Sequence, residues 1–110
     1  MSTVEPVIAG SRGFALALLA PLTERIGTRP RVAADAAHAL PLLAGPGGLL
    51  VVEFVGTDTR RAIEDIVDEA TGVRVVAAVP ERHAAADVLL RALGVEVARW
   101  DGTSAAILGA

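Results

Sequence analysis

The sequence has 110 residues, of which 53% are hydrophobic, and this length suits one compact domain but not two. Ten arginines stand against thirteen carboxylates, giving a net charge of −3 without a basic block, so we expect no nucleic-acid partner. Cysteine and lysine are both absent, which excludes thiol catalysis, disulfides, a P-loop lysine and Schiff-base chemistry.

The first residues, MSTVEP, lack the basic segment and the apolar stretch of a signal peptide. No apolar stretch approaches eighteen residues without glycine, proline or a charge. We therefore expect a cytoplasmic protein without membrane insertion, folded as a single domain over residues 1–110.

The chain begins with a strand, a turn and a helix. Residues 7–9 are a short apolar run that stops at Gly10. Helical periodicity follows from residue 13 and ends near Gly27. Pro21 lies inside this helix, and because proline removes an internal hydrogen bond we predict a bend or a break there.

The next segments lead to the strand around which the domain is organised. Residues 31–34 predict an edge strand, and Asp35 is a candidate cap for a short helix. The sequence AGPGG at 44–48 is a stop signal. The unbroken apolar run at 49–52 then predicts a central strand buried on both faces, with Glu53 at its carboxyl end.

The second half of the chain repeats the alternation of helix and strand. Residues 57–59 supply cap candidates for a helix that ends at Gly72, and residues 73–79 predict a fourth strand. A fifth strand at 95–100 precedes a last apolar segment at 105–108. Between these strands, Pro80 opens a helix whose predicted inward face is Ala85, Val88, Leu89, Ala92 and Leu93.

Five strands alternating with helical segments imply right-handed crossovers and a parallel sheet covered on both faces. At this length the pattern predicts the flavodoxin-like α/β fold, a (βα)5 three-layer sandwich with strand order 2-1-3-4-5. Ligands of such folds gather beyond the carboxyl ends of the strands, which makes Glu53 the residue to explain.

The five units, the carboxylate that ends the third strand and the VVAAVPE fourth strand resemble the receiver domain of bacterial response regulators. The resemblance implies that Glu53 stands where receivers carry the phosphoryl-accepting aspartate. It also places Gly10 and Ser11 at the positions of the acidic metal ligands. The hydroxyl residue that ends the fourth strand in receivers is missing among residues 77–79, and Arg99 is the nearest substitute for the conserved lysine.

Phosphoryl transfer depends on positioning and on cations that neutralise the developing charge. With those groups replaced, the resemblance implies a degenerate member of the family, a pseudo-receiver, with no cofactor and no enzymatic activity. Such domains serve signal transduction as protein-interaction or dimerisation modules in longer signalling or localisation proteins. We expect a protein partner or a homodimer, with the fourth helix, the fifth strand and the C-terminal segment as the contact face.

Three features carry alternative interpretations. Glu53 is either a solvated charge or part of a closed acidic pocket with Arg12 or Arg99 as its cation. The turn GSRG, from Gly10 to Gly13, could bind an anion, which keeps open a small nucleotide-binding domain or enzyme. Trp100 is either an interface anchor or packs under Ile107 or Leu108.

Neither histidine, His38 or His83, has a second histidine or a cysteine at metal-ligand spacing. We therefore interpret both as surface residues and expect no metal site. Ser11 could act as a nucleophile only with a base that the sequence does not place.

Overall fold

The computed structural model describes residues 6–43, 48–70, 72–103 and 107. Most of the predicted stop at 44–48 and of the final apolar segment at 105–108 lies outside these residues. In chain order the elements are β1 (Pro6–Ala9), α1 (Arg12–Ile26), β2 (Arg31–Ala33), α2 (Ala36–Ala39), the 3-10 helix η1 (Leu40–Leu42), β3 (Leu49–Glu53), α3 (Thr57–Glu69), β4 (Arg74–Pro80), the 3-10 helix η2 (Glu81–Ala86), α4 (Asp87–Ala92) and β5 (Glu96–Trp100).

The five strands form one parallel sheet in the order β2-β1-β3-β4-β5, which confirms the predicted flavodoxin-like arrangement. β3 is its central strand, and Leu50 pairs with Val7 on one side and with Val75 on the other. Residues 49–52 of β3 are all buried, as expected for a strand that is covered on both faces.

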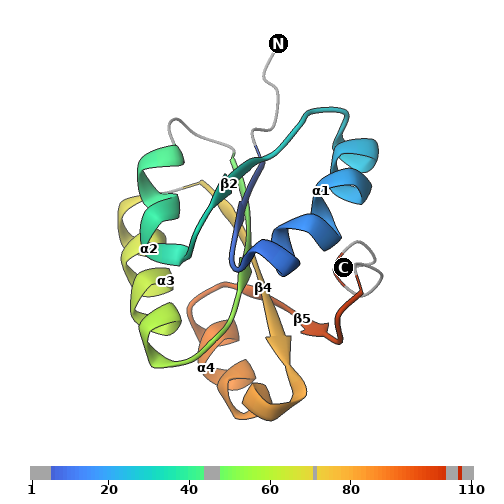
Figure 1. Ribbon diagram of the computed structural model, residues 1–110. Coiled ribbons are helices and arrows are strands. Elements are labelled where there is room, and N and C mark those ends of the chain that lie inside the picture. Colours follow the sequence, from blue (N-terminus) through green and yellow to red (C-terminus); the bar gives the residue numbers. More distant parts are fainter. Residues whose placement is uncertain (1–5, 44–47, 71, 104–106, 108–110) are drawn as a thin grey trace.

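Helices cover both faces of the sheet, with α2 and α3 on the left in Figure 1 and α1 on the right. Because successive side chains of a strand point to opposite faces, each strand contributes to two cores. In β3, Leu50 and Val52 belong to the core beneath α2, α3 and α4, whereas Leu49 and Val51 belong to the core beneath α1. We call these two sides the α3 face and the α1 face.

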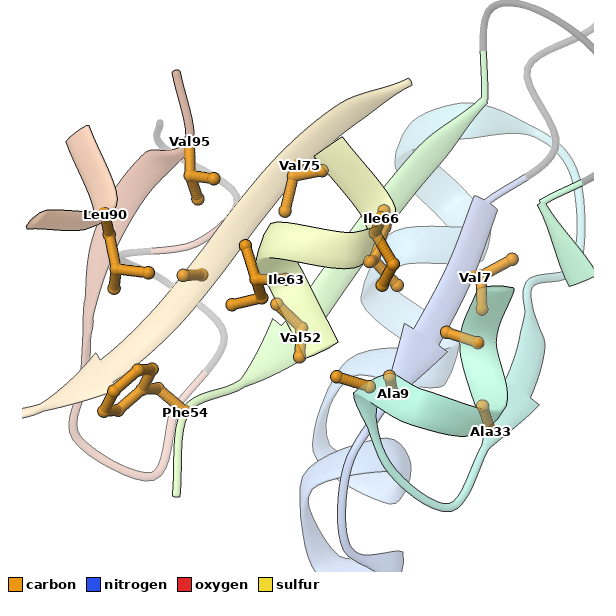
Figure 2. Packing of buried hydrophobic residues seen from close by; sticks show 14 of the residues in the cluster. Val7, Ala9, Ala33, Val52, Phe54, Ile63, Ile66, Val75, Leu90 and Val95 are labelled. Atoms are coloured by element: carbon orange, nitrogen blue, oxygen red, sulfur yellow. The ribbon is translucent and has the colours of Figure 1, made fainter. Parts of the chain in front are cut away.

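The core on the α3 face is closed by side chains from the strands and from three helices (Figure 2). Its fully buried centre includes Val52 of β3, Ile63 of α3 and Leu90 of α4. At about 25 cal/mol per Å² of buried apolar surface, side chains of this size contribute roughly 1.5–3 kcal/mol each. These contacts hold β3 in register and so fix the position of Glu53.

Helix α1 runs without interruption through Pro21, so the predicted break does not occur. Pro21 removes one internal hydrogen bond, but Leu18 and Leu22 beside it are buried against the sheet and retain the helix. The helix ends at Gly27, whose positive φ of 84° lets its N–H bond the carbonyl of Thr23 at 2.7 Å.

The start of α3 differs from the prediction. Its cap residue is Gly56, and none of residues 57–59 acts as a side-chain cap. Thr59 lies within the first turn, is buried, and its hydroxyl accepts a hydrogen bond from the N–H of Val55 at 3.2 Å. The threonine therefore holds the loop after β3 instead of capping the helix.

The predicted inward face of the helix after β4 is wrong at most of its positions, although Leu93 does pack against the α3-face core. Val88 and Leu89 are 80% and 41% exposed, whereas Leu90, which the prediction omitted, is fully buried. The segment begins as the 3-10 helix η2, with a non-helical residue at His83, and only then becomes α4. Because a 3-10 helix turns every three residues, the phase of the apolar positions shifts before α4 begins.

Candidate functional site

The carboxylate of Glu53 is held at the start of α1. Its Oε1 atom accepts a hydrogen bond from the backbone N–H of Ser11 at 2.9 Å. Glu53 belongs to the α1 face because it follows Val51 with the same strand parity. The partner of Glu53 is therefore a backbone amide, which sequence reasoning did not consider.

Gly10 makes this position of Glu53 possible. A β-carbon on Gly10 would lie 2.8 Å from Cβ of Glu53, 3.0 Å from its Oε1 atom and 2.6 Å from Cδ2 of Phe14. Such distances are far below normal contacts, so any larger residue here would displace one of these side chains. The space that a side chain at position 10 would need is thus filled by Glu53 and Phe14.

Ser11 caps α1 with its side chain while its amide binds Glu53. Its backbone is extended, and Oγ accepts a hydrogen bond from the N–H of Phe14 at 3.3 Å. A helix N-terminus carries a partial positive charge and unpaired N–H groups, and a carboxylate placed there is stabilised by about 0.3–1 kcal/mol. The chain supplies its own anion to the turn that was predicted as an anion site.

The groups around Glu53 do not assemble a metal site. Gly10 and Ser11 carry no carboxylate, and Ala78, which pairs with Glu53 across β3 and β4, carries no hydroxyl. Within the described part of the chain, no three histidine, aspartate or glutamate side chains are grouped so that they could hold a metal ion.

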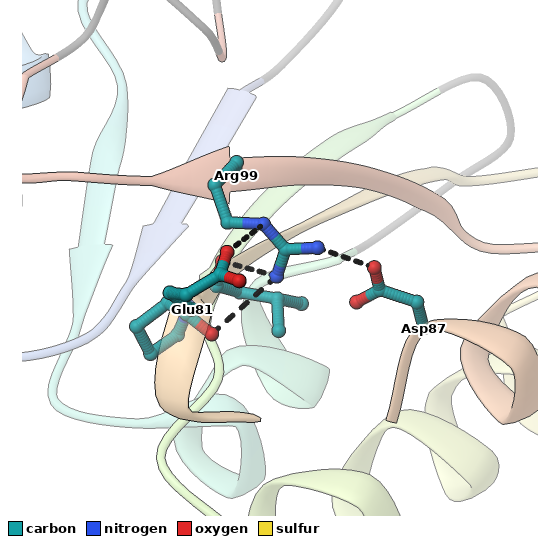
Figure 3. Close-up of polar contacts among 5 residues, drawn as sticks. Glu81, Asp87 and Arg99 are labelled. Carbon is teal, nitrogen blue, oxygen red and sulfur yellow. Dashed lines mark hydrogen bonds and ion pairs between the residues drawn. The ribbon is translucent and has the colours of Figure 1, made fainter. Parts of the chain in front are cut away.

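Arg99 lies on the other face of the sheet from Glu53. It shares strand parity with Val95 and Val97, which belong to the α3-face core. Its guanidinium donates to Asp87 Oδ2 at 2.5 Å and to the carbonyls of Val79 and Pro80 at 3.1 and 3.4 Å (Figure 3). Arg99 is therefore not the cation of a pocket at Glu53.

The Arg99 cluster joins three elements instead. Besides Asp87 at the start of α4, Arg99 approaches Glu81 Oε2 of η2 at 3.4 Å. The Asp87 side chain is only 14% exposed, and its second oxygen, Oδ1, is buried without a hydrogen-bond partner. Removing Arg99 would leave a largely buried carboxylate unpaired, which is costly. This cluster was missed because the prediction assigned Asp87 no role.

Arg12 is exposed in the first turn of α1 and lines a surface groove between α1 and β2. Glu53 binds the amide that precedes Arg12, and no salt bridge to Arg12 is found among the described residues. The alternation of side chains along a strand could have predicted that Arg99 and Glu53 lie on opposite faces of the sheet. A backbone donor such as Ser11 N–H cannot be predicted in this way, because every residue except proline has one.

Trp100 packs on the core of the α1 face. Its ring meets that of Phe14 edge to face, with centroids 4.9 Å apart, and Ile107 is a buried member of the same cluster. Its side chain is half-buried. The predicted packing near Ile107 is thus present, while Leu108 lies outside the described residues.

The two histidines have separate neighbours. His38 is exposed and its ring lies 2.7 Å from Asp35, and the hydrogen bonds from its ring and its backbone N–H lower the pKa of that carboxyl. His83 is half-buried, with its ring edge to face against Phe54 at 5.4 Å. The neighbour of His38 is thus Asp35 and that of His83 is Phe54, and neither of these is a candidate nucleophile.

Comparisons of this chain with protein-family models, with curated proteins and with solved structures gave no match. The resemblance to receiver domains therefore depends on the sheet order and on the residues at the carboxyl ends of the strands. None of the helices in the described residues combines the length and apolar character needed to cross a bilayer.

Proposed function

We propose that this chain is a pseudo-receiver, a receiver-like domain without phosphorylation chemistry that acts as a protein-interaction or dimerisation module in the cytoplasm. The observation that carries the proposal is the hydrogen bond from Ser11 N–H to Glu53 above Gly10. A receiver needs this space for Mg²⁺ and the incoming phosphoryl group, and here a carboxylate fills it. A longer signalling or localisation protein would supply the output.

The runner-up function is a small anion- or nucleotide-binding domain, or an enzyme, that uses the turn from Gly10 to Gly13. It is less well supported because the amide of Ser11 is already bonded to Glu53 and its hydroxyl caps α1. An anion would have to displace the carboxylate and would meet its negative charge. A nucleophilic Ser11 would also need a base, and both histidines have other neighbours.

The contact surface that we propose lies on α4 and β5. Val88 and Leu89, consecutive residues of α4, both expose apolar surface, and β5 is an edge strand of the sheet. The N–H of Val95 binds the carbonyl of Leu90, which ties α4 to the start of β5. Exposed apolar side chains on a rigid element are typical of protein contacts.

Sedimentation equilibrium of the wild type and of a Val88→Asp, Leu89→Asp double variant tests this proposal. We expect the wild type to self-associate, and the double variant to weaken association about tenfold or more because two charges would be buried at the contact. Leu16→Asn, which changes an exposed leucine on α1, is the matched control. A wild type that stays monomeric, or equal association in all three proteins, contradicts the dimerisation role.

A further inference from the structure

The surface between α1 and β2 carries an apolar groove. It consists of two hollows of about 550 and 450 Å³ that share Leu16 and Leu19 of α1 as lining residues. Leu16 is 64% exposed, and Val32, which lines the groove on the side of β2, is 49% exposed. Both side chains thus present apolar surface to solvent on neighbouring elements.

The groove exists because β2 is an edge strand that α1 does not cover. α1 packs through Leu18 and Leu22 onto the inner strands. Ala33 points to the α3 face, so its neighbour Val32 points to the α1 face, where it is half-exposed. The helical layer on this side therefore has room for another helix beside α1.

Charge at the groove has one sign. Each hollow has one charged lining residue, Arg12 in the first and Arg29 in the second, and no carboxylate lines either hollow. Arg12 is exposed at the start of α1, and Arg29 is exposed beyond its end. The lining of the groove therefore presents one cation near each end and favours an occupant with negative charge there.

We propose that this groove binds an acidic amphipathic helix of a partner protein. An apolar stripe of that helix would pack on Leu16, Leu19 and Val32, and carboxylates near its two ends would meet Arg12 and Arg29. Arg12 is the first residue of α1 and Arg29 lies just beyond its end, and the 15 residues of α1 span about 22 Å. A helix of about the same length therefore fits. The inference rests on the proposed interaction role and names a second surface and the chemistry of its partner.

A second copy of this chain is a poor source for that helix. Among the helices that the structure describes, the acidic amphipathic one is α3, and its apolar stripe, including Ile63 and Ile66, is buried in the α3-face core. Presenting that stripe to a groove would unfold the core. The described helices of a second copy therefore do not supply the occupant.

Titration of the ¹⁵N-labelled chain with two synthetic peptides tests the inference. Both are amphipathic helices of about 15 residues with the same leucine stripe, one with glutamates near both ends and the other with lysines. We expect the glutamate peptide to shift amides of α1 and β2 and to bind about tenfold more tightly than the lysine peptide. An Arg12→Glu, Arg29→Glu variant should reverse this preference.

Controls separate this inference from the proposed contact on α4. Leu16→Asn should weaken binding of the glutamate peptide about tenfold. The Val88→Asp, Leu89→Asp variant should bind this peptide as tightly as the wild type does. Equal binding of both peptides, shifts confined to α4, or no binding overturns the groove proposal, whatever the sedimentation result. If Leu16→Asn changes self-association instead, the groove belongs to a second copy and the proposal fails.

Discussion

The two faces of the sheet are built differently although the same five strands supply both. The α3 face is covered by α2, α3 and α4 around a continuous buried core, with a hollow of about 90 Å³ between α2 and α3. The α1 face has one long helix, and beside it lies a cavity of about 110 Å³ near Ile107. It also carries a half-exposed ion pair between Arg74 and Glu96. Both faces contribute buried side chains to the fold. The α3 face is the more closed of the two, and the more open α1 face also carries Glu53, Arg12 and the groove.

This difference between the faces determines which groups Glu53 and Arg99 contact. Glu53 emerges on the open face, where the N-terminus of α1 is near enough to bind its carboxylate. Arg99 emerges on the closed face and joins β4, η2 and α4. One position later, Trp100 returns to the open face and packs on Phe14. Strand parity thus places Glu53 and Arg99 on opposite faces of the sheet.

The largest effect should come from the closed face. Ile63→Ala removes a fully buried side chain of α3 and should lower the free energy of unfolding by about 2–5 kcal/mol. Leu16→Ala on the open face should change it by about 0.5 kcal/mol or less. Urea unfolding followed by circular dichroism measures both. Equal losses would contradict the assignment of Ile63 to the buried core and of Leu16 to the exposed surface.

The next effect should come from Gly10. Gly10→Ala places a β-carbon against Phe14 and Glu53 and should destabilise the fold by about 1–3 kcal/mol. Gly13→Ala is the matched control because nothing lies within 4 Å of its added β-carbon and it stands in α1, where alanine is favoured. If Gly10→Ala is as stable as this control, Glu53 does not lie over Gly10 as described.

The smallest effect should come from the ion pair on the open face. The hydrogen bonds from Arg74 lower the pKa of the Glu96 carboxyl. A lowered carboxyl pKa contributes stability above the unfolded value of about 4.3, and this contribution is lost as pH falls through the folded value.

Both side chains are about half exposed, so Glu96→Gln should cost only about 0.2–1 kcal/mol at neutral pH. Thermal unfolding from pH 7 down to pH 3 measures the cost at each pH. The difference between wild type and variant should shrink as pH falls, since protonation of Glu96 removes its charge from the ion pair. A difference that grows on acidification contradicts this assignment.

The strand order could be predicted because turn residues and apolar segments mark the five strands along the chain. The same pattern predicted that β2 is a short edge strand and that β3 is buried along residues 49–52. The helix after β4 could not be predicted in the same way. Its 3-10 beginning shifts the phase, so Leu90 faces the core where a regular helix would place Leu89.

The candidate site shows a second limit of sequence reasoning. The sequence singled out Glu53 and the turn from Gly10 to Gly13 as candidates, but it suggested arginines as partners of Glu53 because only charged side chains can be read from a sequence. The observed donor is a backbone amide, and Gly10, interpreted as a missing metal ligand, provides the space for the glutamate. Neither the hydrogen bond from the Ser11 amide nor the space above Gly10 can be recognised from residue types or their spacing in the sequence.

The most direct test of the closed site follows the Ser11 amide by NMR while inorganic phosphate is added. In the wild type, Glu53 occupies this amide, so the account predicts no saturable shift of Ser11 or Gly13. In Glu53→Ala the amide is free at the helix N-terminus, and phosphate should shift it at millimolar concentrations. A saturable shift of Ser11 in the wild type, or none in the variant, would contradict the claim that Glu53 is what closes this site.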